Sequence, residues 1–143
     1  MPEQTSLTSR LAGATGLYRG RGDGPESGPF VARMLVGTAV GGRVVTLDYE
    51  ATSDRNGLQH VEHTLLVVGG DGRLELHVAS LELPGVVRFT QSGPEEFTAY
   101  EGPLVARIRL TLPRPGALSY AWWWSRDETE PREQSRADLR HAG

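Results

Sequence analysis

The sequence predicts an all-β fold, a closed antiparallel up-and-down barrel of about ten strands that begins with a short helix. Three observations predict it. Apolar residues recur at every second position over most of the chain, which is the period of a half-buried strand. The 18 glycines and 9 prolines are scattered between these runs at short intervals, as turns between short strands require. The gaps between the runs are too short for the crossover helices of a parallel sheet.

The first residues predict the short helix. Residues 4–12 fit one or two helical turns, with Thr5 or Ser6 as the N-cap. Leu7 and Leu11 then lie on one side of the helix, as expected for a face that packs against a core.

Strand candidates follow along the rest of the chain. Residues 69–72, Gly-Gly-Asp-Gly, are a strong hairpin signal between two of them. The tail, residues 133–142, alternates with a period of two and is predicted as a tenth strand that pairs with the first, although its composition also permits a helix. The nine preceding strands are expected at Leu17–Gly22, Phe30–Val40, Arg43–Ala51, Leu58–Val68, Arg73–Leu81, Val86–Gln91, Glu96–Tyr100, Leu104–Leu112 and Leu118–Ser125.

Length and charge limit the class of protein. The chain has 143 residues, enough for one domain over 1–143 with a sizeable core. Its 15 basic residues, all Arg, are outnumbered by 18 acidic ones, which argues against a nucleic-acid partner. No Cys is present, so disulfides and thiolate metal sites are excluded. Without a signal peptide or an apolar run of membrane length, no membrane association and a cytoplasmic location are predicted.

Three consecutive tryptophans form the most unusual segment. Tyr120, Trp122 and Trp124 share one strand face, and Trp123 points the opposite way. If the first three face inward, they either form a flat wall for a planar or apolar ligand or simply fill the barrel. If they face outward, they form a stripe that seeks a partner subunit. Trp123 on the other face favours self-association as a homodimer.

A second group of polar residues lies on an otherwise apolar strand. His60 and Glu62 face the same way, and His77 on the next strand is a third candidate. Such a set could bind a metal or act as acid and base. The hairpin register, however, is expected to place His63 or Thr64 next to His77. We therefore interpret His60 and Glu62 as polar anchors for a ligand or as structural residues, and we assign no metal site.

Two segments carry a family resemblance. Residues 11–24 resemble the opening of the nitrobindin and fatty-acid-binding-like branch of the calycin barrels, and residues 48–63 are similar to that family's Tyr, Gly and His-x-Glu segment. The resemblance implies a ten-stranded barrel with a pocket for a hydrophobic ligand. The matching residues of the first segment are Leu11, Gly13, Gly20, Gly22 and Gly24, whereas Leu17 and Tyr18 stand where the family has Trp.

The resemblance also implies two possible ligand contacts. Nitrobindins bind haem through a His near the C-terminus, and His141 is the candidate here, although its nearest Leu, Leu139, precedes it. Fatty-acid-binding relatives hold a carboxylate with inward Arg residues. Arg107 and Arg109 alternate with apolar residues in a way that favours solvent-facing side chains instead.

The sequence as a whole favours a barrel that binds a small hydrophobic or planar molecule without catalysis. Tyr120, Trp122 and Trp124 are the expected wall, with His60 and Glu62 as anchors. Two alternatives remain. One is an enzyme that uses His60, Glu62 and His77, or a haem protein with His141 as the axial ligand. The other is a structural homodimer whose barrel is filled by its own side chains.

Overall fold

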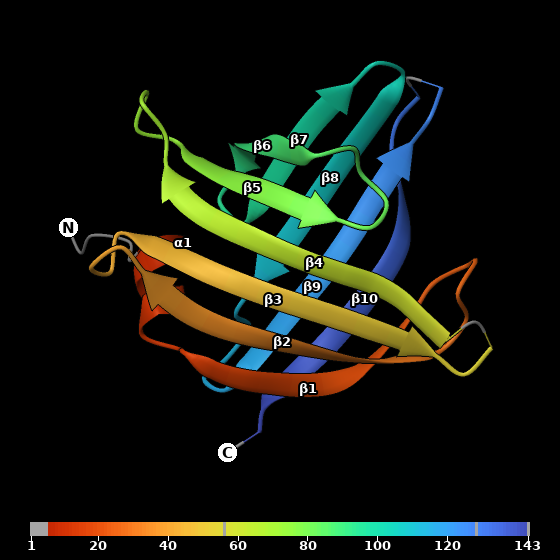
Figure 1. Ribbon diagram of the computed structural model, residues 1–143, viewed down its shortest axis with the longest axis horizontal. Coiled ribbons are helices and arrows are strands. Elements are labelled where there is room, and N and C mark those ends of the chain that lie inside the picture. The colour runs from red at the N-terminus through yellow and green to blue at the C-terminus, as the bar shows by residue number, and fades with distance from the viewer. Residues whose placement is uncertain (1–5, 56, 128, 143) are drawn as a thin grey trace.

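The strands of the chain form one closed antiparallel barrel (Figure 1). The computed structural model describes residues 6–55, 57–127 and 129–142. Each strand pairs with its neighbours in the chain, and β10 pairs with β1 to close the ring. The elements are α1 (Leu7–Ala12), β1 (Gly16–Asp23), β2 (Phe30–Ala39), β3 (Val44–Ser53), β4 (Gly57–Val68), β5 (Leu74–Ser80), β6 (Val86–Gly93), β7 (Glu96–Glu101), β8 (Leu104–Thr111), β9 (Ala117–Ser125) and β10 (Arg132–His141).

The predicted fold class is confirmed, including the tenth strand. Residues 132–141 form a strand with alternating burial, in which Ser135, Ala137 and Leu139 face the interior. The alternative of a helical tail was wrong, because as a strand this segment pairs with both β1 and β9, whose edge backbone groups would otherwise lack hydrogen-bond partners. The hairpin at 69–72 is also as predicted, and Gly72 there adopts a positive φ of 86°.

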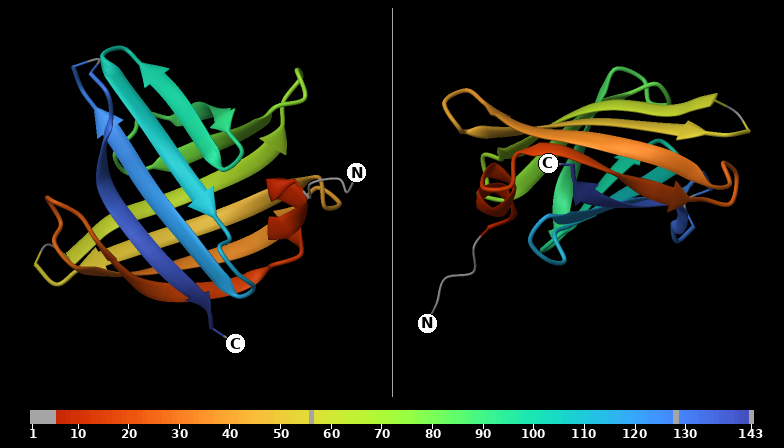
Figure 2. Two further views of the ribbon diagram at one scale, coloured as in Figure 1. Left: turned by 180° about the vertical axis from the view of Figure 1, so that it is seen from behind. Right: turned by 90° about the horizontal axis from the view of Figure 1, so that it is seen from below.

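The helix α1 closes one end of the barrel (Figure 2). The Ser6 side chain caps it by accepting a hydrogen bond from the backbone N–H of Ser9. Leu7 and Leu11 are buried in the core, and Leu11 is fully inaccessible to solvent. The Arg10 guanidinium donates to the carbonyl oxygen of Leu112 on the far side of the barrel, at 3.1 Å. No helix within the described ranges is long and apolar enough to cross a membrane.

The centre of the barrel is filled with side chains. The inward faces of the strands supply fully buried residues from opposite walls, among them Tyr49, Phe89, Phe97 and Ile108. A ten-stranded ring has room for such a packed interior, and here large aromatic groups occupy it. The buried polar residues His60 and Glu62 lie toward the other end of the barrel, which α1 leaves open.

Glycines allow β1 and β10 to approach closely where the ring closes. A Cβ atom on Gly20 would overlap the backbone carbonyl oxygen of Asp138 on β10. A Cβ atom on Gly22 would overlap both the Phe30 ring and the Arg136 carbonyl oxygen. The glycine repeat at the start of the chain therefore has a steric reason.

Candidate functional site

Strand β4 directs two ionisable side chains into the barrel. Its pairing with β3 shifts near the open end, where Ala51 lies opposite His60 but Thr52 lies opposite Leu58. After this bulge the alternation is regular, and both His60 and Glu62 are buried. His63 points outward, where it is hydrogen bonded to Asp48.

Strand β9 supplies two donors to the buried carboxylate. The Tyr120 hydroxyl donates to Oε1 of Glu62 at 2.6 Å, and the Trp122 indole N–H lies 3.2 Å from the same oxygen. Trp122 Nε1 is also 3.0 Å from the Tyr120 hydroxyl oxygen. The two rings are held by Tyr49, 4.6 Å from Tyr120, and by Phe89, 5.5 Å from Trp122 in an edge-to-face contact. A buried carboxylate with this many partners is an ordered polar group, not a packing defect.

His60 connects this buried network to the surface. Its Nδ1 lies 3.7 Å from Oε2 of Glu62 and 3.0 Å from Oε1 of Glu82. Glu82 follows the end of β5, and its side chain is 47% exposed. Glu82, His60, Glu62 and Tyr120 thus form a continuous polar path from solvent into the barrel.

Burial and neighbouring charges shift the pKa values of the two ionisable groups inside the barrel, Glu62 and His60. Desolvation raises the pKa of Glu62 to about 7, although the Tyr120 hydrogen bond, the charge of His60 and the Trp122 hydrogen bond oppose the rise. Desolvation lowers the pKa of His60, but the hydrogen bond that His60 donates to Glu82 and the negative charges of Glu82 and Glu62 outweigh it, so the net shift is upward. Glu62 therefore changes protonation close to neutral pH, and His60 holds its proton to a higher pH than an ordinary histidine does.

A cavity lies directly outside His60, at the open end of the barrel. Its volume is about 260 Å³. A wider hollow of about 770 Å³ adjoins it along the β9–β10 connection and shares four of its residues. The smaller cavity is lined by Glu26, Ser27, His60, Glu82, Trp124, Arg126 and Gln134.

The structure brings together most of the residues that the sequence singled out. Inside the barrel Glu62 contacts the other three, Tyr120, Trp122 and His60. Trp124 is half-buried on the same face of β9, one position nearer the mouth, where it packs against the core and lines the cavity.

His77 does not join this group. It pairs with Leu65, one residue from Thr64 and two from His63, and the alternation of β5 places its side chain on the outer face. There its Nε2 lies 3.0 Å from Oε1 of Glu75. The hypothesis that His60, Glu62 and His77 converge on a metal or a substrate is therefore wrong.

His141 lies at the other end of the barrel from the cavity. Its ring is exposed, packs edge-on against Tyr18 at 5.2 Å, and has Nε2 3.3 Å from the Thr15 carbonyl oxygen. Arg109 projects outward as predicted, toward Glu96 at 3.0 Å. Trp123 lies on that outer face, with the Arg109 guanidinium 5.5 Å from its ring centroid.

Sequence reasoning missed several parts of the site. Glu82, Ser27 and Arg126 lie in connections between strands, where alternation does not indicate the direction of a side chain. Tyr49 could have been found, because it occupies an inward position of β3 and lies opposite Glu62 in the β3–β4 register. Only its pairing with Glu62 depends on the bulge in β4, which alternation does not reveal.

Comparison with known proteins supports the fold. No protein-family model matches the chain, and no curated protein matches it either. Among solved structures, Rv2717c from M. tuberculosis is similar with a TM-score of 0.64 and 17% identity, over 98% of this chain and 100% of that one. The S-type phycobiliprotein lyase CPES from Guillardia theta has a TM-score of 0.64 and 11% identity, over 98% of this chain and 94% of that one. At these identities the likeness establishes the calycin-like barrel alone.

Proposed function

We propose that the chain binds a small planar molecule at the open end of the barrel, with no chemical step. The observation that supports this most directly is the ordered polar path beneath the cavity. Glu62 is buried inside the barrel with two donors on one oxygen, and His60, which lines the cavity, connects it to the cavity wall. Ligand sites commonly combine an apolar or aromatic wall with a few fixed polar groups in this way.

The shape of the site favours a flat ligand. Trp124 contributes an aromatic surface that lines both the cavity and the adjoining hollow. A ring stacked on Trp124 would fill the smaller space, and its substituents would extend into the larger one. Ser27, His60 and Glu82 are the polar residues that line the smaller cavity but not the larger hollow.

The likeness to a phycobiliprotein lyase adds a specific candidate ligand class. A linear tetrapyrrole is planar in segments, longer than it is wide, and carries polar groups along one edge, so it matches a cavity that continues into a hollow. The resemblance to nitrobindins makes haem a second probe. His141 is the residue through which that resemblance would hold haem, and its place beside Tyr18 at the α1 end makes this binding mode separable from the open-end site by mutation.

Tryptophan fluorescence of the full chain tests the proposal. Biliverdin, haemin and 8-anilinonaphthalene-1-sulfonate are titrated separately into the wild type, Trp124→Phe, His60→Ala and Trp123→Phe. Trp123→Phe is the matched control, because it removes a tryptophan from the same strand but from the outer face. We expect saturable binding of at least one probe, with affinity reduced at least tenfold in Trp124→Phe and His60→Ala and unchanged in Trp123→Phe.

Two results would count against the proposal. The first is an absence of saturable binding for all three probes. The second is equal affinity for the wild type and both cavity variants while far-UV circular dichroism shows that the variants are folded. Haemin binding lost in His141→Ala but kept in His60→Ala would move the binding site to the other end of the barrel and contradict the open-end assignment.

A further inference from the structure

Three arginines stand side by side on the outer face of the barrel where the ring closes. In the β10–β1 register Arg140 lies opposite Arg19, and in the β1–β2 register Arg19 lies opposite Arg33. Arg21, two positions along β1, adds a fourth guanidinium to the same face. The alternation of the strands directs these side chains to the outside, so they are separate from the polar path inside the barrel.

This arrangement is electrostatically unfavourable without a partner. Like charges directly opposite each other on neighbouring strands destabilise a sheet. Arg33 has one acidic partner, Glu50, at 3.1 Å from its Nε. Among the residues that the structure describes, no acid lies within ion-pair distance of Arg19, Arg21 or Arg140. Asp138 lies opposite Arg21 in the β10–β1 register, but its carboxylate is 3.7 Å from Arg136 Nε and accepts a hydrogen bond from Ser119. The chain as a whole has a net charge of -3, so this local excess of positive charge is not a general property of the surface.

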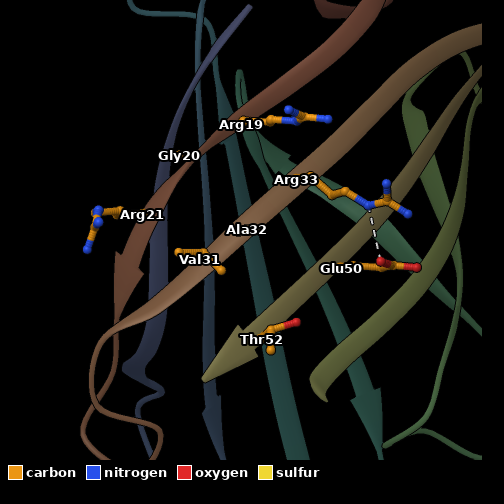
Figure 3. A pocket seen from close by; sticks show the side chains of 8 residues that line it. All are labelled: Arg19, Gly20, Arg21, Val31, Ala32, Arg33, Glu50 and Thr52. Atoms are coloured by element: carbon orange, nitrogen blue, oxygen red, sulfur yellow. Dashed lines mark hydrogen bonds and ion pairs between the residues drawn. The ribbon is translucent and has the colours of Figure 1, made fainter. Parts of the chain in front are cut away.

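The row also borders a concave surface. A depression of about 580 Å³ covers the outer face of β1, β2 and β3. Figure 3 shows Arg19 and Arg33 extending in the same direction from neighbouring strands. Arg33 is hydrogen bonded to Glu50, and Thr52 lies farther along β3. Because Glu50 is bonded through Nε of Arg33, the terminal nitrogens of that guanidinium have no partner among the described residues.

We propose that this depression binds the phosphate groups of a small phosphorylated molecule. A guanidinium presents parallel N–H donors that match two oxygens of one phosphate. Adjacent strands are about 4.8 Å apart, so two neighbouring arginines can contact a single phosphate or two linked ones. Binding would remove the repulsion between the arginines, which gives the row a reason to persist on an otherwise acidic protein. A concave depression fits a compact ligand better than a flat acidic protein surface.

Nuclear magnetic resonance of the arginine Nε–Hε groups tests this in the full chain. Inorganic pyrophosphate is titrated into the wild type, Arg19→Gln, Arg33→Gln and Arg88→Gln. Arg88 is the matched control, since it is an exposed arginine on the outer face of β6, across the barrel from the row. We expect saturable shifts of the Arg19 and Arg33 signals, affinity weakened at least tenfold in Arg19→Gln and Arg33→Gln, and no change of affinity in Arg88→Gln.

Three competing outcomes would overturn the proposal. Equal shifts at Arg88 and at Arg19 would show non-specific ion pairing. Sulfate that binds as tightly as pyrophosphate would remove the preference for phosphate. An acidic peptide such as hexaglutamate that binds more tightly than pyrophosphate would point to a protein partner in place of a small molecule. The substituted side chains are exposed, so circular dichroism is expected to show folded variants, and the pyrophosphate affinity then decides.

Discussion

Replacement of Glu62 by Gln is expected to stabilise the barrel at high pH. The pKa of Glu62 rises from its ordinary value of 4.5 to about 7 because the carboxyl group is buried. A tenfold change in proton affinity corresponds to about 1.4 kcal/mol, so keeping Glu62 ionised at pH 8 costs the folded state about 3 kcal/mol relative to the unfolded chain. Gln removes that ionisation and keeps a carbonyl oxygen for the two donors on β9.

Proton linkage gives the direction in which the stability of the fold changes with pH. Between pH 4.5 and 7 the folded state holds more protons on Glu62 than the unfolded state does, so stability falls as pH rises through this range. The raised pKa of His60 acts in the same direction, since the stability that its charge contributes is lost as pH rises through the folded pKa. The Gln variant therefore loses the Glu62 part of the pH dependence and keeps the part of the His60 contribution that comes from Glu82.

Urea unfolding followed by tryptophan fluorescence at pH 5.5 and pH 8.0 measures this. We expect the free energy of unfolding of Glu62→Gln to be close to that of the wild type at pH 5.5 and higher at pH 8.0 by up to about 3 kcal/mol. Glu101→Gln, an exposed change of the same chemistry at the end of β7, should leave the wild-type pH dependence intact. A Glu62→Gln variant that is less stable than the wild type at both pH values, or that shows the same slope with pH, would refute the reasoning.

Three other substitutions test the packing around the site and the closure of the ring. Tyr120→Phe removes a donor to a buried carboxylate, so urea unfolding at pH 8 should show a loss of about 1.5–3 kcal/mol, and a smaller loss at pH 5.5, where the acceptor is neutral. Leu11→Ala opens a cavity beneath α1 and should cost about 2–5 kcal/mol in the same assay; a loss below 1 kcal/mol would mean that the helix does not seal the core. Gly20→Ala should prevent the folded state seen by circular dichroism, because its Cβ overlaps the Asp138 backbone, whereas Gly70→Ala, with open space around it, should fold normally.

Most of the barrel could be predicted because alternation and turn residues are local signals. The strand at residues 30–40, for example, was placed to within one residue of β2 from its alternating pattern. The tail was harder, since residues 133–142 combine helix-forming composition with a strand period. The segment is a strand because it pairs with both β1 and β9, and this long-range pairing cannot be read from the local sequence.

The candidate site was predictable only in part. Alternation correctly placed His60 with Glu62 and separated Trp122 from Trp123, because each pair lies within one strand. It could not predict which residue of β4 lies opposite His77, because that depends on the exact hairpin register, which pairs His77 with Leu65 and not with His63 or Thr64. The arginine row is missed for the same reason, since Arg140, Arg19 and Arg33 become neighbours only through the registers of three strands.

The pairing of β1 with β10 has a consequence for synthesis of the chain. Gly20 lies opposite Leu139, so these partners are made more than a hundred residues apart. A nascent chain can form its early hairpins in sequence, but β1 keeps a free edge until the last strand emerges from the ribosome. The barrel can therefore close only after β10 has been translated.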